Sequence, residues 1–335
     1  MEANPARLRR STYSNMNKLR LPRWLSPAFL AIIASLSRSA EGAVDHRLLI
    51  GDDSKQRIAL VEPGGRISWE HHLHSIHDLS LLPNGNVLFQ TNWTTVLEMT
   101  PEKRTVWSYD SNSHSGSAGK NVEIHAFQRL PNGLTMIAES GRARIIEVDP
   151  HGKIQHEIKL KVEHPSVHSD TRMARKLSNG NYLVCHESDG AVREYDSTGK
   201  VVWDFPVPLF GRERKGGHGP EAFGNAVYGA LRFPNGNTLV ATGNGHSLLE
   251  VTPTNEIVWS LHQHELPGIQ LAWVTTLSLL PNGNIVFGNC HAGPDYPQII
   301  EITKDKKVIW TFKDFQNFGN SLPVSQVIDP GALIR

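Results

Sequence analysis

The sequence has 335 residues, which is enough for one large domain or two of ordinary size. Hydrophobic residues make up 39% and charged residues 20%, and the net charge of +1 creates no global field that would attract nucleic acid or an acidic membrane. The two cysteines, Cys185 and Cys290, are too few for a disulfide framework, and we expect each to be a buried free thiol.

The N-terminal segment has the layout of a secretory signal peptide. A basic head with one lysine and two arginines precedes an apolar run at 24–36, and small residues follow it. The run is too short to span a bilayer comfortably, so a retained membrane anchor is the weaker interpretation. We expect a true start at Met16, cleavage after Ser39 or Gly42, and a secreted or periplasmic mature chain with no stable membrane span.

A short phrase then recurs five times along the chain. It reads SLLPNGNVLF at 80–89, and related phrases occupy 128–137, 175–184, 231–240 and 278–287. Asn-Gly between apolar runs is a strong hairpin signal and predicts a type I′ turn, with positive φ at both central residues. Each phrase is followed by a third run and a fourth run, and the fourth usually carries a tryptophan. Four short strands in a period of about 40–50 residues predict one blade of a β-propeller.

The two ends of this repeat pattern complement each other. The stretch 47–72 has a second, third and fourth strand but no first, and 321–329 is a single β-like run. The fourth strands provide six equivalent positions, namely Trp69, Trp107, His156, Trp203, Trp259 and Trp310. We therefore predict an all-β fold, a six-bladed β-propeller of four-stranded antiparallel blades, in which the C-terminal strand joins the N-terminal blade and closes the ring.

This prediction divides the chain into an N-terminal extension with its signal peptide (1–43) and a single propeller domain (44–335). The tryptophans have a structural explanation. One large aromatic side chain per blade, wedged against the next blade, stabilises the ring by burying apolar surface and need not bind a ligand.

The blade text also resembles known families. YDSTGKVVW (195–203) resembles the signature of quinoprotein-like (PQQ-like) repeats, and IHDLSLLPNGNVLF (76–89) resembles a blade of arylsulfotransferase-type six-bladed propellers. The resemblance covers roughly 45–335 and implies the propeller fold, whereas activity does not follow from it, because propellers host unrelated functions. Among proteins with such repeats, the quinoprotein dehydrogenases are expected to form an eight-bladed ring with adjacent cysteines near the cofactor. Six blades and two well-separated cysteines argue against bound PQQ here.

The histidines are divided unevenly between the two faces of the predicted ring. In an up-and-down blade, the Asn-Gly turns share one face, and the connections between blades share the other with the loops between second and third strands. All of the 17 histidines except His46, His151 and His156 map to this connector face or to strand ends leading to it. Histidine titrates near neutrality, binds metals and carries protons, so we expect the connector face to be the functional one.

The innermost strands line the central channel, and their register can be compared from blade to blade. Equivalent positions hold His77, His125, Arg172, Tyr228 and Thr275. The guanidinium of Arg172 suits sulfate, phosphate or carboxylate, and Tyr228, with Trp273 two residues earlier in the register, offers flat surface for a sugar or aryl ring. The alternative is a water-filled channel plugged by polar side chains.

Three further segments are expected at the rim of this channel. CHESDG (185–190) carries His186 and Glu187, and GNCHAGPD (288–295) carries His291. The longest connector, 206–225, carries Arg212 and Arg214 and is either a basic lid over an anionic ligand or a rim loop.

Three classes of function fit these features. The first is a binding propeller for a small anionic, glycan or aryl ligand. The second is an enzyme, in which His77, His125 or His291 accepts a sulfuryl group stabilised by Arg172, as the arylsulfotransferase resemblance implies. A variant of the second is a metal-dependent lyase or hydrolase, with the same three histidines as ligands of a divalent metal ion. The third is a scaffold that binds protein partners across its rim.

Overall fold

The structure is a computed structural model that describes residues 45–114, 121–329 and 333–334. From Val44 onwards the chain forms one compact unit. The predicted signal peptide, its cleavage sites and Met16 lie outside the described residues. In the described part of the chain, no helix has both the length and the apolar character needed to cross a membrane.

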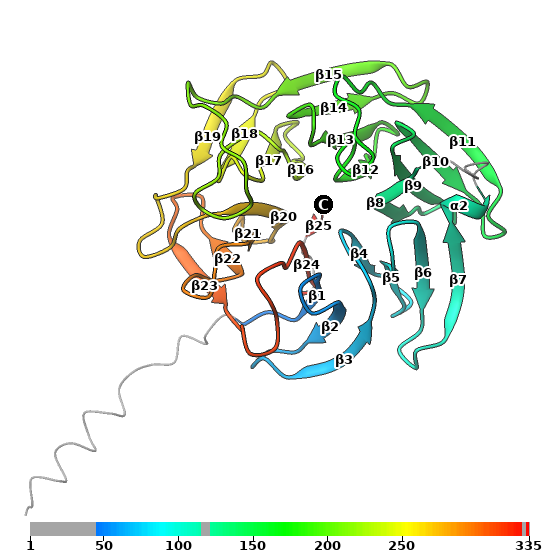
Figure 1. The fold of residues 1–335 in the computed structure, drawn as a ribbon, viewed down its shortest axis with the longest axis horizontal. Helices are drawn as coiled ribbons and strands as arrows, with labels where there is room; N and C mark the ends of the chain where they lie inside the picture. Colours follow the sequence, from blue (N-terminus) through cyan, green and yellow to red (C-terminus); the bar gives the residue numbers. More distant parts are fainter. Residues whose placement is uncertain (1–44, 115–120, 330–332, 335) are drawn as a thin grey trace, which may run out of the picture. The chain divides into compact units, whose positions relative to one another are not determined.

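Six antiparallel sheets form a ring around a central axis, as Figure 1 shows, so the predicted six-bladed propeller is confirmed. Blade one contains β24 (Val324–Val327), β1 (Leu48–Asp52), β2 (Arg57–Val61) and β3 (Ile67–His72). Blade two contains β4 (Leu79–Leu81), β5 (Val87–Gln90), β6 (Thr95–Met99) and β7 (Thr105–Asp110), followed by the single turn α2 (Ser111–His114). Blade three contains β8 (Glu123–Arg129), β9 (Thr135–Ser140), β10 (Arg144–Val148) and β11 (Ile154–Lys159).

The remaining three blades repeat this plan from the inside outwards. Blade four contains β12 (Ala174–Lys176), β13 (Tyr182–His186), β14 (Ala191–Tyr195) and β15 (Val201–Pro206). Blade five contains β16 (Gly229–Arg232), β17 (Thr238–Ala241), β18 (Leu248–Val251) and β19 (Ile257–Leu261). Blade six contains β20 (Trp273–Leu279), β21 (Ile285–Cys290), β22 (Ile299–Ile302) and β23 (Val308–Phe312).

The ring closes through the C-terminal strand, as predicted. β24 pairs antiparallel with β1, with Leu49 opposite Gln326 and Ile50 opposite Ser325. Figure 1 shows these strands, from opposite ends of the chain, side by side. The packing at this seam is close, because a Cβ atom at Gly51 would lie 2.5 Å from Cγ1 of Val324. A larger residue at Gly51 would therefore push the closing strand away.

A final short strand was not predicted from the sequence. β25 (Leu333–Ile334) pairs with the inner edge of β20, so the sheet of blade six has five strands. β25 thus lies in the central opening (Figure 1). Two residues are too few to show a period-two pattern, which is why sequence analysis did not find this strand.

The hairpin turns differ from the predicted type I′ geometry. Gly85 has a φ of 84°, whereas Asn84 is not among the residues with positive φ. The amide of Leu82 donates to the carbonyl of Asn86 (2.8 Å), and the amide of Gly85 donates to the carbonyl of Leu82 (2.9 Å). These bonds close a three-residue loop in which Pro83 fixes φ near −65° and glycine takes the left-handed position. The prediction was wrong because it assumed a two-residue loop, whereas three residues lie between the bonded ends. The same bonds and the same glycine conformation occur in blade four, where Ser178 replaces the proline.

A buried glutamate in the third strand of blades two to six links each blade to the next. Glu194 accepts a hydrogen bond from Nδ2 of Asn181 in its own turn (2.6 Å) and one from Nη2 of Arg232 in the next blade (2.7 Å). This role explains the second asparagine of the repeated phrase. The equivalent glutamates and their cross-blade partners are Glu98 with Arg129, Glu147 with Lys176, Glu250 with Lys304 and Glu301 with His46.

The tryptophans lie between blades, as predicted, but they are only half-buried. Nε1 of Trp259 donates to the carbonyl of Lys304 in the next blade (2.8 Å), and Nζ of Lys304 lies 4.3 Å from the ring centroid. Cations of the next blade also lie over Trp107 and Trp203. The tryptophan side chains therefore stabilise the propeller partly through cation–π contacts, in addition to burying apolar surface.

Candidate functional site

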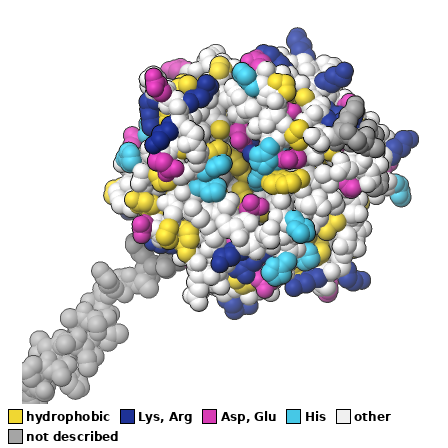
Figure 2. Space-filling view, in the orientation of Figure 1, with side chains coloured by type: hydrophobic (Ala, Val, Ile, Leu, Met, Phe, Trp, Pro, Cys, Tyr) yellow, Lys and Arg dark blue, Asp and Glu magenta, His cyan; other side chains and the backbone are white. Residues whose placement is uncertain are grey.

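A cavity of about 260 Å³ lies at the central axis, at the connector-face end of the channel. It is lined by residues of the inner strands and by residues of the connectors and loops on that face. In Figure 2, histidine and hydrophobic side chains gather around the centre of the molecule. The lining includes His77, Trp93, His168, Arg172, His218, Tyr228, Trp273, Thr275 and His291.

Three residues from blades two, three and four meet beside this cavity, and two of them, His77 and Arg172, line it. His77 and Arg172 each lie two positions before the start of the inner strands β4 and β12, and His125 lies in β8. Nδ1 of His77 lies 2.7 Å from Nδ1 of His125, and Nη1 of Arg172 lies 2.8 Å and 3.2 Å from these two atoms. The register comparison from the sequence anticipated this juxtaposition, because the inner strands are all anchored to the same turn.

Burial controls the protonation of the two imidazoles. It lowers the pKa of His77 and His125 well below the usual value, and the positive charge of Arg172 lowers both further. Arg172 itself donates from Nε to Oε2 of Glu187, whose side chain is 13% exposed. The guanidinium charge is therefore balanced within the site.

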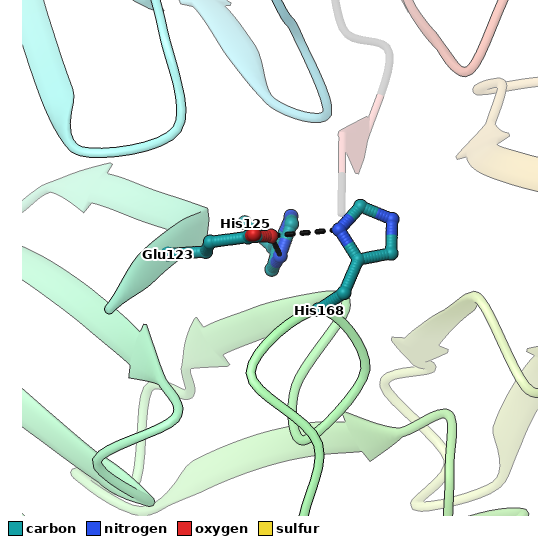
Figure 3. Close-up of side chains that lie close together, drawn as sticks. All are labelled: Glu123, His125 and His168. Carbon is teal, nitrogen blue, oxygen red and sulfur yellow. Dashed lines mark hydrogen bonds and ion pairs between the residues drawn. The ribbon is translucent and has the colours of Figure 1, made fainter. Parts of the chain in front are cut away.

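A second group adjoins the first through His125. Oε2 of Glu123 lies 3.0 Å from Nε2 of His125 and 2.7 Å from Nδ1 of His168, and Figure 3 shows the three side chains converging. Glu123 and His125 come from β8, while His168 comes from the connector between β11 and β12. The ring of Trp93 packs against both histidines, with centroid distances of 5.3 Å and 5.1 Å.

The opposite wall of the cavity is aromatic. The ring of His218 lies 4.9 Å from that of Trp273 and 5.1 Å from that of His291. Burial, followed by the nearby imidazole of His218, lowers the pKa of His291 to about 4. Tyr228 and Thr275 are 7% and 0% exposed, and their hydroxyl groups have no hydrogen-bond partner among the described residues.

Three of the residues predicted at the site lie elsewhere. His186 is buried within blade four, where Nδ1 donates to the carbonyl of Asp170 (2.8 Å) and Nε2 accepts from the hydroxyl of Tyr195 (2.8 Å). Arg212 stacks over the ring of Phe223 at 3.5 Å, and Arg214 donates to Oδ1 of Asn225. The connector 206–225 therefore contributes His218 to the central cavity, and not the two arginines.

The predicted metal ligands His77, His125 and His291 do not form one group. His291 lies beside His218 on the opposite wall of the cavity. Among the described residues, the group of side chains that could hold a metal ion is Glu123, His125 and His168. Sequence analysis did not recognise Glu123 as a ligand. The Glu-x-His spacing was an available signal, since residues two apart in a strand share a face. The position of His168 depends on a connector whose path local patterns do not define.

Both cysteines are free and buried, as expected. Burial raises the pKa of each thiol, to about 12 for Cys290, which lines the cavity near Ser321. Neither thiol is therefore ionised near neutrality, which argues against a thiolate nucleophile in the site.

Comparisons with known proteins agree with this architecture. A crystal structure of a protein of unknown function from Bacteroides caccae is 23% identical, with a TM-score of 0.70, covering 85% of this chain and 100% of that chain. A streptogramin B lyase is 16% identical, with a TM-score of 0.54 over 81% and 83% of the two chains. A catalytically inactive virginiamycin B lyase from Staphylococcus aureus with quinupristin is 14% identical, with a TM-score of 0.53 over 82% and 86%.

At these identities the similarity shows the fold alone. Comparison with curated proteins finds no match. The family model described as outer membrane protein assembly factor BamB matches residues 54–312, most of the chain. The protein therefore belongs to this family of PQQ-like repeat propellers.

Proposed function

We propose that the protein is an exported binding propeller, whose central cavity takes a small ligand with a flat aryl or sugar ring and an anionic acceptor group. The observation that carries this proposal is that two residues lining the cavity, Tyr228 and Thr275, have buried hydroxyls without a hydrogen-bond partner among the described residues. A buried polar group without a partner costs about 1–3 kcal/mol, so a ligand that supplies the missing hydrogen bonds gains that energy on binding.

The cavity walls support the chemical class of this ligand. Trp93 and Trp273 provide aromatic surface, against which an aryl ring or the apolar face of a sugar can pack. Arg172 uses Nε for Glu187 and Nη1 for the two imidazoles, which leaves Nη2 for an acceptor oxygen. A volume of about 260 Å³ is at the small end for ligand pockets and matches a single ring with one substituent.

Removing the two unpartnered hydroxyls is expected to separate binding from stability. Tyr228→Phe and Thr275→Val should leave the free energy of unfolding unchanged or raise it by up to about 1 kcal/mol, because neither hydroxyl is satisfied. Each should weaken binding about tenfold. A panel of 4-nitrophenyl sulfate, 4-nitrophenyl phosphate, benzoate and glucuronic acid, titrated by calorimetry and by tryptophan fluorescence, provides the measurement.

Tyr182→Phe is the matched control for this pair. The hydroxyl of Tyr182 donates to Oε1 of Glu147 (2.6 Å) away from the cavity, so its loss should lower stability and leave binding unchanged. If no member of the panel binds, or if Tyr228→Phe and Thr275→Val bind as tightly as the wild type, the proposed site is wrong.

Export is supported by the basic head, the apolar run and the small residues that follow it. We expect the mature protein to start near residue 40–44 and to be recovered from the periplasm or the medium. Intact mass of the protein from each cell fraction measures this directly, and a full-length chain retained in the cytoplasm would contradict it.

The other hypotheses predict different behaviour from the same protein. Sulfuryl transfer predicts turnover of 4-nitrophenyl sulfate that is lost on substitution of His77 or His125. A scaffold predicts no small-molecule binding and a protein partner on the rim. The likeness to lyases concerns the fold, so no lyase reaction is inferred from it.

A further inference from the structure

We propose that Glu123, His125 and His168 form a binding site for a divalent transition metal ion, zinc above all, in the wall of the central cavity. This inference does not depend on the ligand proposed above, because it rests on a different group of side chains. It also differs from the metal site expected from the sequence, since only His125 is shared.

The three donor atoms are already close together. Oε2 of Glu123 lies 3.0 Å from Nε2 of His125 and 2.7 Å from Nδ1 of His168. Donors that lie about 2.0–2.1 Å from a common ion are about 3.0–3.4 Å apart, depending on the coordination angle. All three donor atoms lie within 4.8 Å of one another, so binding requires the carboxylate oxygen to move slightly outward and the two imidazole nitrogens to come within about 3.4 Å of each other. The side chain of His168, which is 51% exposed, has room to make this movement.

The donor set is one that transition metals prefer. Two imidazole nitrogens and one carboxylate oxygen are the protein ligands of many catalytic zinc sites, in which water or substrate takes the remaining position. The same set suits other first-row divalent ions, whereas calcium and magnesium prefer oxygen ligands throughout. His168 lines the cavity, so an ion bound to it would lie at the cavity wall. A water molecule or a ligand oxygen could complete its coordination there.

The surroundings hold the central ligand in place. Nδ1 of His125 lies 2.7 Å from Nδ1 of His77, and the ring of His125 is buried. A histidine that binds a metal through Nε2 carries its hydrogen on Nδ1 and donates it to a neighbouring acceptor. His77 can provide this acceptor. In this tautomer Nη1 of Arg172 donates to Nδ1 of His77 alone, so His77 and Arg172 would act as the supporting shell of the metal ligands.

The local charges also favour a cation. The ion-pair partners of Glu123 in the described part of the chain are the two imidazoles, and neither lysine nor arginine is among them. Arg172 is already paired with Glu187, and Asp53 adds a further carboxyl group to the cavity lining. The carboxylate of Glu123, whose side chain is 20% exposed, has no lysine or arginine in direct contact among the described residues, and a divalent ion would provide the positive charge that it lacks there.

Cobalt(II) provides a direct test, because its visible absorption reports the ligand geometry. Full-length protein treated with a chelator should bind one Co²⁺ per chain, and Zn²⁺ should displace it. Glu123→Gln and His168→Ala should each weaken binding by about 100-fold or more while thermal unfolding stays close to that of the wild type.

Two matched variants make the result specific to this site. His164 lies on the same connector, is 69% exposed and pairs with Asp189, so His164→Ala should bind Co²⁺ like the wild type. Tyr228→Phe should do the same, which separates this site from the proposed ligand contacts. The proposal is overturned if wild-type protein takes up no Co²⁺ at about 0.1 mM. It is also overturned if Glu123→Gln and His168→Ala bind as the wild type does, or if His164→Ala is impaired equally.

Discussion

A chain that ends at residue 319 is expected not to reach the native fold, because it lacks the strand that closes the ring. All four residues of β24 are buried, and Val324 and Val327 belong to two different apolar clusters that flank blade one. Without them, the inner edge of β1 is unpaired and Leu49 and Ile50 lose cover. Two buried valines are worth about 1.5–3 kcal/mol each, and the lost ladder hydrogen bonds add to this. The sum is comparable with the whole stability of a typical domain, about 5–15 kcal/mol.

A chain that ends at residue 329 is the matched control for this truncation. It keeps β24 and lacks only the residues after it, so it should unfold cooperatively at nearly the temperature of the full-length protein. Circular dichroism and thermal unfolding compare the two chains. A peptide of residues 320–329, added to the shorter chain, should restore cooperative unfolding by occupying the open position beside β1. A 319-residue chain that folds cooperatively by itself would show that closure by β24 is dispensable.

Substitution of His46 is expected to have the next largest effect, because this residue takes the place of arginine or lysine at the closing interface. Nε2 of His46 lies 2.8 Å from Oε2 of Glu301, Nδ1 contacts Asp329, and the ring packs edge-on against Trp310. His46 is 3% exposed and Glu301 is fully buried. Breaking such a pair from one side costs about 3–5 kcal/mol, and we expect this loss for His46→Ala.

The same contact makes ring closure sensitive to pH. Burial opposes the charge on His46, but the hydrogen bonds to Glu301 and Asp329 outweigh it and raise its pKa above the usual value. A raised pKa in the folded state means that the stabilisation is complete below the unfolded-state value of about 6.5 and is lost as pH rises through the folded-state value. Burial also lowers the pKa of His186 and His291, and there it dominates, so that both fall to about 4. Their contribution to stability is therefore present above pH 6.5 and decreases as the pH falls towards 4.

Urea unfolding of wild type and His46→Ala between pH 5 and 9 measures both effects. The difference in free energy of unfolding between the two proteins should be largest at the acidic end and shrink towards the alkaline end. His151→Ala, which removes an exposed histidine, should match the wild type throughout. A difference that stays constant with pH would show that His46 acts by packing alone.

The sequence by itself determined the ring and much of the inner lining. The repeated hairpin phrases, the strand spacing and the incomplete first and last repeats can all be recognised within short stretches of sequence. They therefore predicted six blades and closure by the C-terminal strand. The register of the inner strands brought His77, His125 and Arg172 to one level, because each strand is counted from the same turn. Type I′ turns were wrongly predicted, since the strand pairing leaves a loop of three residues and not of two.

Only the tertiary structure decided which side chains of the connectors enter the cavity. Connector 206–225 contributes His218 to the cavity, while its Arg212 and Arg214 contact Phe223 and Asn225 of the same connector. The connector after β11 brings His168 to Glu123. His186, one strand position from the rim, points into its own blade and bonds to Tyr195. These outcomes follow from contacts between segments far apart in the sequence. Connectors have no repeating pattern, and their paths are set by packing against neighbouring blades.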